Sequence, residues 1–115
     1  MPKTKLSGPL TPAVLHILLA LADGEKHGYA ILQTIAEQSH DAMRMGAGTL
    51  YGTLKRLLDA KWICEEPSRS DSDDPRRRYY RLTGDGERAL KTELDRMEAV
   101  LKSAVGKGLI VGGTA

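Results

Sequence analysis

The chain has 115 residues, of which 41% are hydrophobic and 28% are charged, which is enough for one globular domain and too little for a two-domain enzyme. Its net charge of +2 is too small to indicate a polyanionic partner by itself. The single cysteine, Cys64, excludes an intramolecular disulfide and a multi-cysteine zinc site. The most apolar stretch, residues 13–22, has about half the length of a membrane span. We therefore expect a cytoplasmic protein without membrane contact.

The first predicted helix covers residues 13–22. Thr11 is a suitable cap and Pro12 suits the first helical position. The helix is apolar on every side except at His16, and such a helix has to be covered on more than one side. Because a small domain provides little cover, this helix is a candidate dimer surface. The expected interface residues on it are Leu15, Leu18 and Leu19.

Two further helices are predicted, over residues 28–38 and from residue 48 or 49 to residue 61. The inner face of the second of these carries leucines at helical spacing, whereas its outer face is small and polar. Gly52 lies on that outer face, although a glycine inside a helix costs about 1 kcal/mol relative to alanine. It is either a neutral surface feature or a place where the helix backbone approaches another surface closely.

A hairpin and a last helix complete the predicted elements. Strands over residues 62–66 and 76–82 bracket a polar loop, and Thr83 caps a helix over residues 84–105. Apolar residues recur along this helix at alternating steps of four and three, which is a heptad pattern. A two-fold dimer would bury this seam; the alternative is that it packs only on its own domain. The expected interface residues are Leu90, Leu94, Met97, Leu101 and Ala104.

The positive charge is concentrated in residues 44–81, which carry nine basic and six acidic residues. Two helices joined by a turn and followed by a hairpin form the layout of a winged helix-turn-helix. We expect a mainly helical α+β fold with a DNA-binding domain over residues 1–82 and a dimerisation helix with a short tail over residues 83–115. The alternative for the basic strand is a solvated charged surface. The candidate DNA-binding residues are Thr49, Tyr51, Gly52, Thr53, Lys55, Arg56, Arg76, Arg77, Arg78 and Tyr79.

Three short motifs stand in a fixed order along the chain: His27-Gly28-Tyr29, Gly48-Thr49-Leu50-Tyr51 and Arg78-Tyr79-Tyr80-Arg81-Leu82-Thr83. Together they resemble the PadR family of bacterial transcriptional regulators, over about residues 10–101. The resemblance implies a winged-helix homodimer that is held through its first and last helices and represses promoters. It also implies release by a small phenolic or drug-like effector. The chain departs from the family pattern at Gly52, where proline is usual, and at Trp62, where glycine is usual.

Other functions fit the sequence less well. An enzyme is not expected, because no nucleophile has a nearby base, no paired carboxylates stand in a plausible cleft and no phosphate-cradling glycine loop follows a strand. The three histidines have no partners at metal-ligand spacing, so no metal or cofactor is expected. Cys64 is more typical of a structural thiol than of a redox sensor. A winged-helix module that binds a protein partner instead of DNA remains the alternative.

Two details of the expected DNA and effector contacts depend on single residues. Three aspartates at the hairpin tip, Asp71, Asp73 and Asp74, would repel phosphate, so we expect the base of the wing to contact DNA. Trp62 and Tyr29 are candidate walls of an effector pocket, together with the apolar dimer helices.

Overall fold

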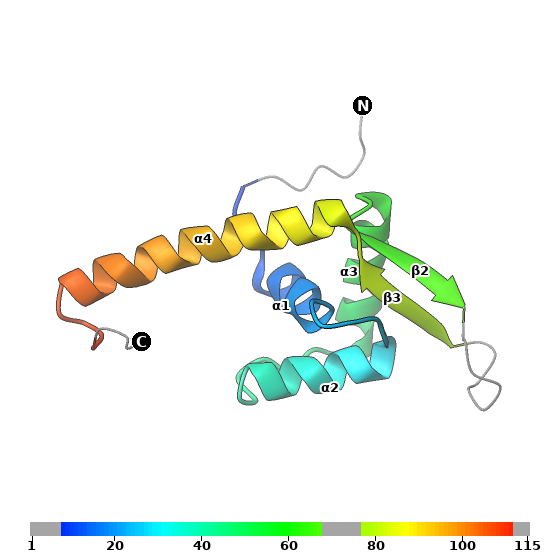
Figure 1. Cartoon of the computed structure of the whole chain (residues 1–115). Helices are drawn as coiled ribbons and strands as arrows, with labels where there is room; N and C mark the ends of the chain where they lie inside the picture. Colours follow the sequence, from blue (N-terminus) through cyan, green and yellow to red (C-terminus); the bar gives the residue numbers. More distant parts are fainter. Residues whose placement is uncertain (1–7, 68–76, 112–115) are drawn as a thin grey trace.

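The computed structural model describes residues 8–67 and 77–111. Its elements are α1 (Pro12–Ala20), β1 (Lys26–His27), α2 (Gly28–Gln38), α3 (Ala47–Asp59), β2 (Ile63–Pro67), β3 (Arg78–Leu82) and α4 (Gly84–Gly106). The helices α2 and α3 lie around α1, and the hairpin of β2 and β3 projects from one end of this group (Figure 1). The last helix, α4, extends past the other elements. This arrangement is a winged helix-turn-helix with a long last helix, as predicted.

Within the described residues, three of the four helices begin with a side chain that accepts a backbone N–H of the first turn. Thr11 accepts from Val14 at 3.2 Å, and Thr83 accepts from Gly86 at 3.1 Å. His27 caps α2 through its Nδ1 atom, which accepts from the N–H of Ala30 at 3.2 Å. These bonds satisfy N–H groups that have no partner inside a helix. In contrast, α3 follows Gly46 with no side-chain cap, so its first turn is left open.

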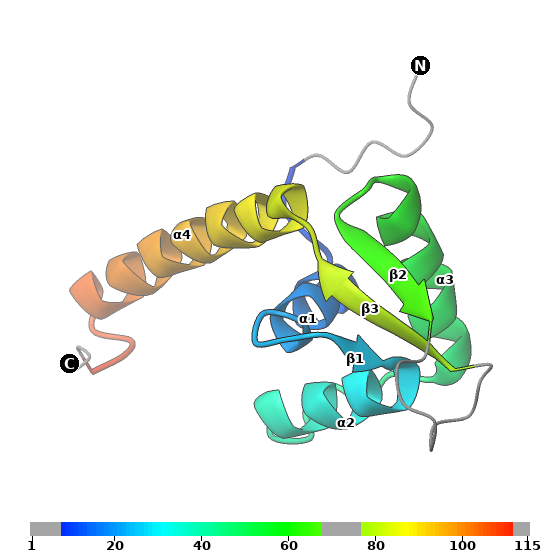
Figure 2. The same ribbon diagram turned by 45° about the vertical axis from the view of Figure 1, so that its right-hand side comes forward.

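The sheet has three antiparallel strands in the order β1-β3-β2, with β3 in the middle. In the hairpin, Ile63 pairs with Leu82 and Cys64 pairs with Arg81. The two-residue strand β1 was not predicted; it pairs with the other edge of β3 and joins the start of α2 to the wing (Figure 2). Tyr80 of β3 is buried because its side chain packs in the hydrophobic core.

The hydrophobic core lies between α1, α2 and α3 and is closed by the hairpin and the first turns of α4. Leu18 is completely buried in this core and Leu90 is 3% exposed. Both were predicted at a dimer interface, and the structure corrects this: α1 packs on three helices at once, so Leu18 faces the interior of its own protomer. Leu90 covers the same core from the start of α4.

Beyond Glu93, which is buried, α4 leaves the domain (Figure 1), and its apolar seam is exposed. Leu94, Met97 and Leu101 are exposed there, whereas Ala104 is half-buried. The short apolar tail after α4, residues 109–111, is exposed as well.

A tight corner joins α3 and β2 to the start of α4. Lys61 adopts a left-handed conformation with φ of 64°. Thr83 binds this corner twice, because its Oγ1 donates to the Lys61 carbonyl at 2.7 Å and its N–H donates to the Trp62 carbonyl at 3.0 Å. Gly86 lies against the same Trp62 carbonyl, where an added Cβ would overlap the oxygen. The position that favours glycine is therefore Lys61 rather than Trp62.

Candidate nucleic-acid interface

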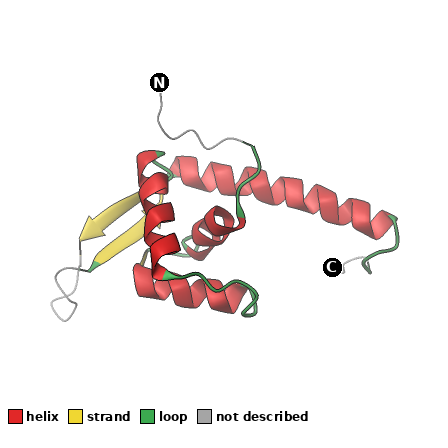
Figure 3. Cartoon of the chain, turned by 180° about the vertical axis from the view of Figure 1, so that it is seen from behind, coloured by secondary structure: helices red, strands yellow, loops and turns green. Residues whose placement is uncertain are grey.

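The outer face of α3 is exposed, small and basic. Leu50, Leu54 and Leu57 anchor the helix in the core. On the opposite side, nothing lies within 4 Å of the Cβ position of Gly48 or Gly52. Seen from behind, α3 lies in front of the domain and its outer side is not covered by another element (Figure 3). The exposed predicted contacts on it are Thr49, Tyr51, Gly52, Lys55 and Arg56.

Two of the predicted contact residues do not belong to the exposed surface. Thr53 is only 2% exposed because it lies on the flank of α3 that faces the core. Its hydroxyl accepts a hydrogen bond from Arg56 Nη2 at 3.4 Å, so Thr53 helps to position a predicted contact instead of making one. Tyr79 is half-buried and packs edge-on against the His27 ring, with 5.5 Å between the ring centres. It therefore joins β3 to β1.

The base of the wing presents the exposed arginines Arg77 and Arg78. The Arg78 guanidinium is 3.8 Å from the Glu65 carboxylate, which is a long and mostly solvated pair. Arg81 is bound more tightly within the wing, because its Nε donates to Glu66 Oε2 at 2.9 Å, and this hydrogen bond raises the pKa of Arg81. Of the other predicted wing residues, Arg76 and the tip aspartates Asp71, Asp73 and Asp74 lie outside the described residues.

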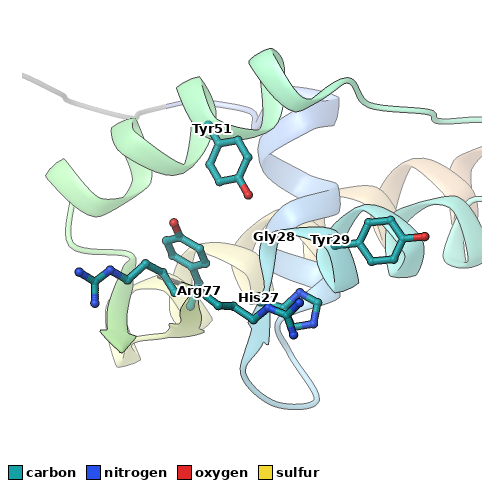
Figure 4. A pocket seen from close by; sticks show the side chains of 7 residues that line it. His27, Gly28, Tyr29, Tyr51 and Arg77 are labelled. Carbon is teal, nitrogen blue, oxygen red and sulfur yellow. The ribbon is translucent and has the colours of Figure 1, made fainter. Parts of the chain in front are cut away.

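A cleft of about 270 Å³ joins α3 to the wing and to the start of α2. Its walls are His27, Gly28, Tyr29, Tyr51, Arg77, Arg78 and Tyr80. In Figure 4, the Tyr51 hydroxyl points toward Gly28, while Arg77 and His27 lie across the opening. Burial, with a smaller effect of Glu65, raises the pKa of Tyr80. Sequence reasoning missed this cleft because β1, which brings His27 to the wing, has no recognisable pattern.

The two predicted effector-pocket residues lie in different places. Trp62 lines a cavity of about 270 Å³ between the N-terminal segment and α4, whereas Tyr29 lines the cleft described above. A third, more apolar pocket of about 450 Å³ lies between α1, β3 and α4 and includes Leu19, Leu82 and Leu94. No group of three or more His, Cys, Asp or Glu side chains that could hold a metal ion occurs in residues 8–67 and 77–111.

No helix within the described parts of the chain is both long enough and apolar enough to cross a membrane.

Known proteins share this architecture. The chain is 26% identical to a transcriptional regulator from Clostridium thermocellum, with a TM-score of 0.69 over 83% of this chain and 87% of that one. Bacillus subtilis PadR, solved in complex with operator DNA, is 26% identical with a TM-score of 0.62 over 70% of this chain and 45% of that one. A 37.1 kDa protein in transposon TN4556 of Streptomyces fradiae is 40% identical over 85 residues.

That match covers 74% of this chain and 23% of the relative, so the chain spans about a quarter of the transposon protein. The model of the transcriptional regulator PadR-like family matches residues 17–92, which include the second half of α1, all of α2 and α3, the wing and the first turns of α4. Members of this family are transcriptional regulators and not enzymes, in agreement with the expectation from the sequence. The chain belongs to the PadR-like family of transcriptional regulators.

Proposed function

We propose that the chain is a dimeric repressor, which binds pseudo-palindromic operator DNA in the cytoplasm through α3 and the base of the wing. One observation carries this proposal: the cleft makes α3 and the wing arginines a single continuous surface. Lys55 and Arg56 project from α3, and Arg77 and Arg78 project from the wing beside it. The B. subtilis relative in complex with operator DNA supports the same assignment.

In this complex α3 lies in the major groove with its open first turn and its small outer face against the base edges. The glycines at positions 48 and 52 allow the helix backbone to approach the DNA closely, since no side chain extends from them. Lys55 and Arg56 supply hydrogen-bond donors to bases or phosphates. The wing arginines bind phosphates along the backbone, which fixes orientation without reading sequence.

The second copy of the chain covers the exposed seam of α4. Leu94, Met97 and Leu101 repeat at heptad spacing along a helix that extends beyond its own core. Two-fold packing of this seam places two copies of α3 and of the wing on one DNA molecule. Half-sites are then expected about 10 bp apart, on the same side of the duplex.

Release by a small aromatic effector completes the proposal. The apolar pocket between α1, β3 and α4 has the size and lining of a small-molecule site. A ligand in this pocket would contact α1 and β3 on one side and α4 on the other, and would change the angle of α4 to the rest of the domain. Its binding would therefore alter the distance between the two copies of α3.

Fluorescence anisotropy with labelled DNA from the region upstream of the chain's own gene tests DNA binding. Lys55→Ala and Arg56→Ala should each weaken binding by about 5- to 150-fold if they contact bases, and Lys91→Ala on α4 should leave it unchanged. Equal affinity of the unmodified protein for scrambled DNA would contradict specific repression. A panel of phenolic compounds that does not release DNA would contradict effector control.

A further inference from the structure

Gly28, at the start of α2, is buried beneath the side chain of Tyr51 from α3. A Cβ added at Gly28 would overlap the Tyr51 hydroxyl oxygen and would lie 3.0 Å from the ring carbon that carries it. Only glycine leaves room for the phenol in this position. Figure 4 shows the hydroxyl of Tyr51 directed toward Gly28.

The surface on which Tyr51 rests is itself held firmly. His27 caps α2 by accepting the Ala30 N–H, and its ring packs edge-on against Tyr79 of β3. His27 also pairs with Tyr79 in the sheet, so the first turn of α2 is fixed to the wing. A side chain that is 52% exposed would ordinarily sample several rotamers. The absence of a Cβ at Gly28 leaves room for the orientation in which the phenol lies over this turn.

The cleft beside Tyr51 has the chemistry of an oxyanion site. Arg77 and Arg78 supply positive charge, and the phenols of Tyr51 and Tyr80 supply neutral hydrogen-bond donors. Guanidinium and phenol donors that line one cleft suit a backbone phosphate, whose two non-bridging oxygens accept hydrogen bonds.

We propose that Gly28 is a positioning residue for DNA binding: its missing Cβ seats Tyr51 in the cleft, where Tyr51, Arg77 and Arg78 bind one backbone phosphate. This inference rests on the proposed function, because the phosphate belongs to the DNA that α3 reads. A phosphate contact carries no sequence information, so its loss lowers affinity for operator and scrambled DNA by the same factor.

A double-mutant cycle tests the positioning role. Tyr51→Phe removes the donor, and Gly28→Ala displaces the end of the Tyr51 side chain; each should weaken DNA binding about tenfold, with equal loss on operator and scrambled DNA. In a Tyr51→Ala background, Gly28→Ala should cause no further loss, because the side chain that it displaces is already gone. Gly84→Ala at the start of α4 is the matched control, because its added Cβ would meet only the end of the Arg88 side chain at an ordinary 3.7 Å, and it should bind as the unmodified protein does.

The salt dependence of DNA binding distinguishes the charged arginine contact in the cleft from the neutral Tyr51 contact. Arg77→Ala should reduce the slope of log affinity against log salt by about one, whereas the neutral changes at Tyr51 and Gly28 should leave the slope unchanged. A further loss on adding Gly28→Ala to Tyr51→Ala would overturn the positioning role. Unchanged affinity in Tyr51→Phe would overturn the phosphate contact, even if Gly28→Ala does not fold. If the unmodified protein binds no DNA, the proposed function and this inference both fail; if it binds operator and the variants match it, the inference alone fails.

Discussion

Truncation of Leu101 to alanine tests whether the seam of α4 holds two protomers together. Leu101 is 53% exposed in the single chain, on the part of α4 that extends beyond the core. Full burial of a leucine side chain is worth about 1.5–3 kcal/mol, so covering the exposed half contributes about 1 kcal/mol per protomer. A two-fold interface counts each change twice, so Leu101→Ala should weaken the dimer by about 2 kcal/mol. This corresponds to a rise of about 30-fold in the dimer dissociation constant.

Sedimentation equilibrium at several protein concentrations measures this constant directly. Lys102→Ala is the matched control, because Lys102 neighbours Leu101 and makes only an exposed 4.0 Å pair with Glu98. Its dimer should be as stable as that of the unmodified chain. An unchanged dissociation constant in Leu101→Ala, or an equal rise in Lys102→Ala, would refute the reasoning that the apolar seam is the interface.

Three further predictions concern the corner and the wing. Gly86→Ala should lower the free energy of unfolding by about 1–3 kcal/mol, because the added Cβ meets the Trp62 carbonyl. Gly84→Ala should not lower it. Equal melting temperatures of the two variants would contradict this prediction. Lys61→Gly should be neutral or stabilise by up to about 1 kcal/mol in a urea titration, since φ of 64° favours glycine; a clear loss of stability would argue against the left-handed corner. The pKa of Tyr80 is raised in the folded state, so its contribution to stability is present below the ordinary value of 10.0 and is lost as pH rises through the higher folded pKa. Above pH 10.0, the unmodified chain should therefore lose more stability with rising pH than Tyr80→Phe does. Denaturation curves that shift equally with pH in both proteins would exclude this role.

Local patterns in the sequence were sufficient to predict the helices and the hairpin. The apolar period over α2 gave its bounds as the structure has them, residues 28–38. Capping residues located the starts of the first and last helices, because Thr11 and Thr83 each make the cap bond that their position suggested. The strand β1 has only two residues, too few to show any period, and it forms because β3 offers a free edge.

Burial of individual side chains was harder to predict than the elements themselves. Thr53 was predicted as a DNA contact, but it lies on the flank of α3 that packs on the domain and is therefore buried. Leu90 continues the heptad pattern of α4, yet the first turns of that helix cover the core of their own domain. Periodicity identifies an apolar stripe, but it does not reveal whether the stripe packs on its own domain or on a second copy of the chain.

Long-range contacts were not predictable from spacing. Gly28 and Tyr51 belong to two separate motifs, and only the folded arrangement of α2 and α3 places the phenol over the glycine. Similarly, Thr83 could be recognised as a helix cap, but its second bond to the Lys61 carbonyl depends on the corner geometry. These contacts connect α3 to α2, and the corner after α3 to the start of α4.

Hydroxyl-radical footprinting on the DNA upstream of the chain's own gene tests the central claim most directly. If two copies of α3 read adjacent major grooves of one operator, the protein should protect two symmetric segments about 10 bp apart on one face of the duplex. Arg77→Ala should weaken both segments equally, because each protomer contributes one wing. A single unpaired protected segment, or uniform protection without a fixed site, would contradict binding of a two-fold dimer to an operator.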